Sequence, residues 1–323
     1  MEMSEPEKRI FWLDIMKGVG ILLVVLQHCL PAGDLSRFIL AFHMPLFFFA
    51  SGIVYKNNGS ASHFCVSKLS SLFLPLFCVA ILNFIISTVF VCFVSANLSH
   101  APLLRGGWFV EVLLCVECIY FLLDRKASCF AERSILLFSA IVLFALCELV
   151  IGPSYLKTRV VFHQQIAAGC FFFMLGNIGR AVYDRELTAK ARIAFGVSGI
   201  AVLGVLGFCT RYNCDVLMND GQFGAMPVFI GNACLGIAGV FCLSRAMNSC
   251  GILQFFGRNS LLILFTHPPI MAVSGYFLYT CMRIRVSYFA SVLIFFLIVL
   301  LELIIIPICN RFFPWITGKY RIE

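Results

Sequence analysis

The sequence predicts an all-α polytopic membrane protein with about ten transmembrane helices and both termini in the cytoplasm. Of its 323 residues, 61% are hydrophobic and only 12% are charged, and the mean hydropathy is +0.97. These values lie far outside the range of soluble domains. The apolar runs have the length of membrane-spanning helices, about 20 residues, and lack the alternating pattern of outer-membrane barrels. The class is therefore helical, with the lipid bilayer as its surroundings.

Apolar runs between polar breaks define the spans, and no soluble domain, low-complexity linker or internal repeat interrupts them. We therefore expect residues 1–323 to form a single integral-membrane domain without an appended soluble domain. The third span is long enough to be tilted or broken, and Pro75 near its start favours a kink. The predicted spans cover approximately residues 11–30, 36–55, 69–95, 107–123, 134–151, 162–182, 192–209, 225–247, 258–280 and 286–310.

The distribution of Lys and Arg sets the predicted orientation. With the N-terminus inside, sixteen of the 24 Lys and Arg residues fall on the inner side and seven on the outer side, and Lys17 lies within the first span. This excess is the positive-inside pattern of membrane proteins. It also accounts for the net charge of +8, so we expect no nucleic-acid partner. The 16 cysteines lie mostly in apolar runs without metal-ligand spacing, and we expect no metal site.

Polar residues interrupt the first span. Lys17 and His28 are eleven residues apart, so at about 100° per residue they share one helix face, roughly 16 Å apart along the axis. Asp14 is placed to pair with Lys17, and Gly18 and Gly20 allow a ligand or another helix to approach closely. Two interpretations stay open: a snorkelling ion pair with an interfacial histidine, or a functional site that faces protein or water.

The second span ends in the segment FHMPLFFFASG, in which His43 is followed two residues later by Pro45. A proline inside a span frees backbone groups that must be satisfied internally. A histidine beside such a break, next to a span that carries a second histidine, favours a polar intramembrane cavity. Ser51 and Gly52 then permit close packing against another helix.

These two segments and three later ones resemble the membrane acyltransferases of family 3, particularly the fucose 4-O-acetylase-like branch. The first span contributes the opening WLDIMKGVGILLVVLQH, with its basic residue and histidine separated by ten positions. The later segments are GGWFVEVLL at 106–114, FFFMLGNIGR at 171–180 and FGRNSLLILFTH at 256–267. The five segments follow the family order and cover nearly the whole chain.

The resemblance implies transfer of an acyl group, usually acetyl, from cytoplasmic acetyl-CoA to a hydroxyl of a carbohydrate. The acceptor would be a polysaccharide, lipopolysaccharide or lipid-linked sugar at the outer side of the cytoplasmic (inner) membrane. Family members often carry arginine where this chain has Lys17, so a fork-shaped cation is replaced by a point charge. We expect no C-terminal esterase-like domain of the kind that larger relatives have. Both a monomer and a homodimer stay open.

Acyl transfer to a hydroxyl needs a base, donors for the developing oxyanion and cations for the coenzyme. Histidine, with an unperturbed pKa of about 6.5, is the usual base. We choose His28, acting either by direct activation of the acceptor or through an acyl-imidazole. His43 would orient that base or bind the acyl carbonyl, or simply form a hydrogen bond between helices.

The coenzyme is expected to meet polar residues on the inner side, although topology alone would also place cations there. We favour Arg258 and its two successors, because free N–H groups at the start of a span help to bind anions. The full set of candidates is Asp14, Lys17, Lys68, Arg180, Arg258, Asn259 and Ser260.

For the acceptor, Trp108 and Glu111 lie one turn apart at the outer start of the fourth span, close to Arg105. An aromatic ring beside a carboxylate is a common way to hold a sugar, but an interfacial aromatic belt fits the same pattern. His163, at the start of the sixth span, and His267, before two prolines, are further candidates.

Two other functions remain open at this point. The intramembrane His, Lys and Asp residues would also suit a transporter or flippase for a small molecule or glycan precursor. Transporters often show paired broken helices in two related halves, and this sequence has no such repeat. The other alternative is a membrane partner of a glycan-assembly complex that keeps the fold without turnover.

Overall fold

The computed structural model is predominantly α-helical in the part of the chain that it describes, and no strand occurs there. The described residues are 9–56, 60–81, 85, 107–126, 132, 135, 138–139, 163–183, 186–247, 249–281, 283 and 287–318. Within them, seven helical segments are long and apolar enough to cross a membrane: Phe11–Cys29, Asp34–Val54, Ala61–Ile81, Ala189–Tyr212, Met226–Ala246, Ser260–Leu278 and Tyr288–Phe312. The polytopic helical class is thus confirmed.

Two further helices, α6 (Trp108–Lys126) and α9 (His163–Tyr183), coincide with the predicted fourth and sixth spans but contain more polar residues. The predicted span 134–151 falls almost entirely outside the described residues, so the count of ten stays a prediction. The remaining helices are α1 (Phe11–Cys29), α2 (Asp34–Leu40), α3 (His43–Val54), α4 (Ala61–Lys68), α10 (Ala189–Cys209), α11 (Met226–Ala246), α12 (Gly251–Arg258), α13 (Ser260–Gly275) and α14 (Tyr288–Phe312).

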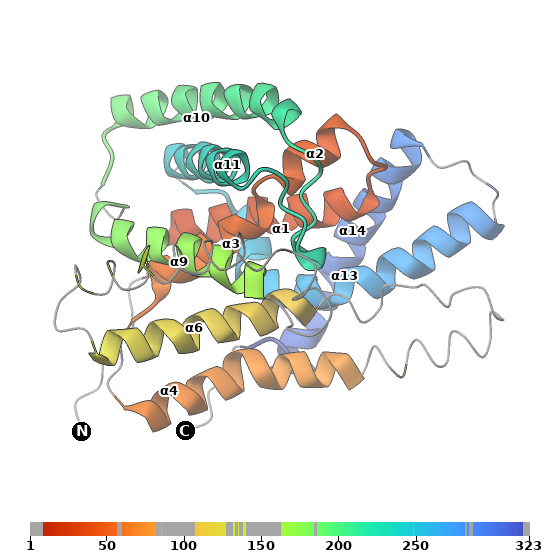
Figure 1. Cartoon of the computed structure of the whole chain (residues 1–323). Coiled ribbons are helices and arrows are strands. Elements are labelled where there is room, and N and C mark those ends of the chain that lie inside the picture. The colour runs from red at the N-terminus through yellow and green to blue at the C-terminus, as the bar shows by residue number, and fades with distance from the viewer. Residues whose placement is uncertain are drawn as a thin grey trace, which may run out of the picture.

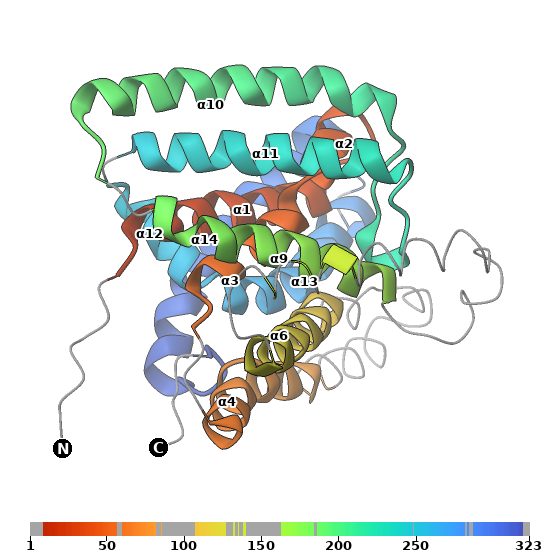
Figure 2. The same ribbon diagram turned by 60° about the vertical axis from the view of Figure 1, so that its left-hand side comes forward.

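The helices are arranged in layers, as Figures 1 and 2 show from two directions. Helix α10 forms one outer layer and covers α11, which packs on α1 and α3 in the centre. Helix α9 lies beside α3, and α6 and then α4 follow on the opposite side of the bundle. Helices α13 and α14 pack on each other and on α1. Helix α1 is therefore surrounded by protein along much of its length.

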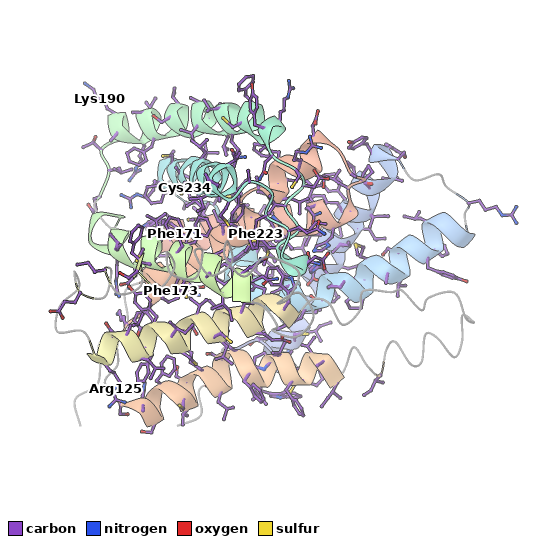
Figure 3. All side chains as sticks on the ribbon, viewed as in Figure 1. Arg125, Phe171, Phe173, Lys190, Phe223 and Cys234 are labelled. Carbon is purple, nitrogen blue, oxygen red and sulfur yellow. The ribbon has the colours of Figure 1, made fainter. Side chains whose placement is uncertain are left out.

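The two ends of α1 define the two ends of the bundle, which we call the Lys17 end and the His28 end. Helix α14 finishes at the Lys17 end, where the Asn310 side chain donates a 2.9 Å hydrogen bond to Asn259. Figure 3 shows Arg125, at the end of α6, and Lys190, at the start of α10, on the same side of the bundle. Which side of the membrane this end faces stays a prediction from the charge count.

The second predicted span is broken into α2 and α3 at residues 41–42. The break comes before Pro45, which occupies the first turn of α3, where its missing N–H is not needed. His43 donates its Nδ1 hydrogen to the carbonyl of Ile39, 2.9 Å away, in the last turn of α2. The irregularity expected at Pro75 appears as a π-helical turn over Leu69–Phe73, immediately before it.

Glycines set the closest helix crossings. A methyl group on Gly52 of α3 would overlap the carbonyl oxygen of Phe173 on α9, and one on Gly176 would overlap the carbonyl oxygen of Phe49. This reciprocal contact confirms the close packing expected at Gly52. Gly18 of α1 meets the backbone of α12 in the same way. The approach allowed by Gly18 is therefore that of another helix, not of a ligand.

Candidate active site

A cavity of about 380 Å³ lies at the His28 end of α1. We call it the histidine cavity, because His28 of α1, His43 of α3 and His267 of α13 all line it. Trp108, at the start of α6, and residues 216–220 of the loop between α10 and α11 complete its wall. Both predicted catalytic histidines thus meet two of the predicted acceptor residues, Trp108 and His267.

Backbone carbonyls hold two of the three imidazole rings. The Nδ1 atom of His43 lies 2.9 Å from the carbonyl oxygen of Ile39, and that of His267 lies 2.7 Å from the carbonyl oxygen of Ile263. Because a carbonyl only accepts, each Nδ1 must bear the hydrogen. In a neutral ring this leaves Nε2 as the atom that accepts a hydrogen bond from a ligand.

His28 differs from the other two histidines in its surroundings. His43 and His267 are 5% and 2% exposed, whereas His28 is exposed where it lines the cavity. Its ring lies against that of His267, with centroids 5.2 Å apart and planes inclined by 41°. Within the described residues no hydrogen bond fixes the His28 ring, so a bound molecule can set its orientation.

A second, smaller cavity of about 160 Å³ lies toward the Lys17 end of α1. Lys17 lines this lysine cavity together with Ser51 of α3 and Ser260 at the start of α13. In the part of the chain that the structure describes, the Lys17 ammonium group has no hydrogen bond and no ion pair. It is a cation placed in a cavity without a partner of its own.

The Asp14 carboxylate does not form the predicted ion pair with Lys17. It accepts instead from Arg9 at 3.2 Å and from Arg258 of α12 at 3.0 Å. The pairing follows from the close contact of α12 with α1, which brings the last turn of α12 over the first turn of α1. The short ion pairs of Asp14 are therefore formed with Arg9 and Arg258 and not with Lys17.

The other predicted coenzyme residues hold the fold together, with one exception. Lys68 donates to Glu117 of α6 at 2.9 Å, and Arg180 of α9 donates to the carbonyl of Tyr55 at 2.9 Å. The Asn259 side chain donates to the carbonyl of Phe255 at 2.7 Å and accepts from Asn310. Ser260 is the member of the predicted Arg258–Ser260 set that lines the lysine cavity.

The two cavities adjoin each other. Met44 of α3 and Leu264 of α13 line both of them, and these side chains are only 5% and 8% exposed. The two residues therefore form an apolar partition between the space around Lys17 and the space around the histidines. The shared wall lies along the face of α1 that carries both Lys17 and His28.

The remaining predicted acceptor residues have different outcomes. Glu111 is exposed and does not line the histidine cavity, and the pairing of Trp108 with Glu111 around one ligand stays a prediction. Arg105 and the side chain of His163 lie outside the described residues. The carboxylate that does line the cavity is Asp220, which sequence reasoning missed. In the sequence, Asp220 is marked only by its place in a polar, glycine-containing loop, and nothing there connects that loop to His28.

The fold and the two cavities define a polytopic α-helical membrane protein with a polar site inside the helix bundle. The model of acyltransferase family 3, described as an acyltransferase domain, matches residues 10–315. The chain therefore belongs to this family and is a membrane acyltransferase. No curated protein and no solved structure matches it. The resemblance seen in the sequence is confirmed for the family, whereas the fucose 4-O-acetylase-like branch stays a prediction.

Proposed function

We propose that this protein is an O-acetyltransferase of the cytoplasmic membrane, which moves acetyl from acetyl-CoA to a hydroxyl of a cell-envelope or lipid-linked glycan. The observation that supports this proposal best is the pair of adjoining cavities on one face of α1. One contains an unpaired ammonium group, which suits an anionic donor, and the other contains three imidazoles, which suit proton transfer. The proposed acceptors are those of the fucose 4-O-acetylase-like branch.

In this proposal the Lys17 end faces the cytoplasm and receives the coenzyme. Lys17 would contact the anionic groups of the donor as a point charge. Ser260, on the same cavity wall, would donate a hydrogen bond nearby. The thioester arm would then pass the partition of Met44 and Leu264, both of which are apolar side chains able to change rotamer.

The reaction itself would take place in the histidine cavity. His28 accepts the proton of the acceptor hydroxyl while the hydroxyl oxygen attacks the thioester carbonyl carbon. The new C–O bond forms, the C–S bond breaks, and the proton on the imidazole passes to the leaving thiolate, which departs as free coenzyme A. The Nδ1–H groups of His43 and His267 already donate hydrogen bonds to backbone carbonyls. These rings would therefore use Nε2 to accept hydrogen bonds from the sugar and orient it.

The test is a transfer assay with purified protein, radiolabelled acetyl-CoA and a panel of glycans. We expect His28→Ala to lower label transfer by about 100-fold or more, the usual contribution of a general base. The matched control is His63→Ala, because His63 is exposed on α4 and lines neither cavity. Normal transfer by His28→Ala would refute the assignment of the base. Uptake of a glycan precursor without any loss of thioester would instead support the transporter hypothesis.

A further inference from the structure

The loop between α10 and α11 has a defined conformation over residues 213–225. Asn213 donates its side-chain amide to the carbonyl of Phe223 at 3.0 Å and accepts from the N–H of Ala225 at 3.0 Å. Leu217 and Gln222 exchange two backbone hydrogen bonds, of 2.8 and 3.0 Å. The tight turn between them uses a left-handed residue that favours glycine, Gly221, with φ of 69°. The loop is therefore preformed.

Side chains from two other helices fasten this loop over the histidine cavity. Arg37 of α2 donates to Asp215 at 2.7 Å, and Gln165 of α9 donates to the carbonyl of Asn219 at 3.4 Å. Phe223 is buried and packs against Phe229 of α11 at a centroid distance of 5.0 Å. Figure 3 shows Phe223 in the interior of the molecule. Contacts on three sides thus fix the position of the turn.

The turn presents one carboxylate to the cavity. Asp220 lines the cavity and is exposed there, and no hydrogen bond or ion pair occupies its carboxylate within the described residues. Asp215, in contrast, is held by Arg37. Trp108 contributes an aromatic ring to the same cavity, and His28 lies in the same wall. A carboxylate, an indole and the proposed base therefore surround one space.

We infer that Asp220 and Trp108 form the acceptor subsite, and that it selects a neutral sugar residue. The inference rests on the proposed function and specifies its substrate class. A carboxylate accepts hydrogen bonds from two neighbouring hydroxyl groups, and an aromatic ring packs on the C–H face of a pyranose. A volume of about 380 Å³ fits one sugar residue, not a long glycan segment. A uronic acid would place a second carboxylate near Asp220, which like-charge repulsion disfavours.

The subsite is tested by direct binding to the full-length protein in detergent, so that the result does not depend on turnover. The probes are methyl glycosides of neutral hexoses and 6-deoxyhexoses, each compared with methyl uronides that differ by a carboxylate. We expect the wild type to bind at least one neutral glycoside about ten-fold or more tightly than the uronides. Asp220→Asn should lose about ten-fold in neutral-sugar affinity, the usual effect of removing a charged hydrogen-bond acceptor.

Glu186→Gln is the matched control, because Glu186 is an exposed acid that lines neither cavity. Its sugar affinity should equal that of the wild type. Affinity of Asp220→Asn within two-fold of the wild type, preference for uronides, or failure of the wild type to bind either set would overturn the inference. The label-transfer assay separates this outcome from failure of the proposed function. If the wild type transfers acetyl and Asp220→Asn transfers it equally well, only the acceptor subsite is refuted and the proposed function stands.

Discussion

Replacement of Lys17 by methionine should weaken binding of the acyl donor without destabilising the fold. The ammonium group of Lys17 faces the lysine cavity and has no partner in the described chain. Removing it therefore leaves no carboxylate without a counter-ion, and methionine fills a similar volume. Loss of one charge-assisted hydrogen bond to an anionic ligand costs about 1.5–3 kcal/mol, or roughly 10- to 150-fold in the dissociation constant.

The same change at Lys68 should lower the stability of the fold. Lys68 is bonded to Glu117 at 2.9 Å, and Glu117 is only 6% exposed, with its second carboxylate oxygen buried and unbonded. Lys68→Met would leave that carboxylate without its counter-ion. Breaking a buried ion pair by removing one member costs about 3–5 kcal/mol, so the loss falls on stability. Both lysines are coenzyme candidates in the sequence, and their partners now distinguish them.

Both effects are measurable on the same samples. Binding of a non-hydrolysable acetyl-CoA analogue gives the donor dissociation constant, and thermal unfolding in detergent gives the stability. We expect Lys17→Met to change only the first and Lys17→Arg to restore it, since arginine keeps the positive charge. Donor affinity of Lys17→Met equal to the wild type would remove Lys17 from the coenzyme site. A drop in its melting temperature as large as that of Lys68→Met would show that Lys17 has a structural counter-ion.

Two other changes test the packing and the partition between the cavities. Gly52→Ala should lower the free energy of unfolding by about 1–3 kcal/mol, because the new methyl group overlaps the Phe173 carbonyl and forces α3 and α9 apart. Gly204→Ala is its control, since a methyl group there meets nothing within 4 Å, and equal melting temperatures for both variants would contradict the packing argument. Met44→Ala should raise acetyl-CoA hydrolysis in the absence of acceptor, because it removes part of the wall that the two cavities share. Hydrolysis no faster than that of Met226→Ala, a change at an exposed methionine, would argue against a partition.

Much of the architecture follows from local features of the sequence. Helix-length apolar runs predict where the membrane helices lie, and Pro45 predicts the interruption of the second span. Gly52 predicts a close crossing with another helix, but the sequence does not indicate which helix that is. The partner is α9, reached across more than a hundred residues, and Asn177 completes the contact by donating to the carbonyl of Gly52 at 3.2 Å. Such pairings depend on the arrangement of whole helices, which periodicity does not determine.

The same distinction, between features of a single helix and contacts between helices, applies to the candidate site. The shared face of Lys17 and His28 comes from the pitch of a single helix, so spacing alone predicts it. The partners of Asp14 and Lys68 come from other helices, and spacing assigned the first of them wrongly. Asp220 lies on a loop far along the chain, and only folding brings it to the cavity. Sequence reasoning therefore predicted the shared face of α1 and cavity-lining residues such as His43, Trp108 and His267, but not Asp220 or the partners of Asp14.

The orientation of the histidines gives a physical reason to prefer His28 as the base. His43 and His267 each donate Nδ1–H to the carbonyl four residues earlier, which fixes the ring and its tautomer. A fixed ring with a free Nε2 is well suited to accept a hydrogen bond and to hold a substrate in place. The base has a different task, because it must take a proton from the acceptor oxygen and deliver it to the thiolate sulfur. Of the three rings, His28 is the one exposed to the cavity and without a backbone bond among the described residues, so it can turn from the first atom to the second.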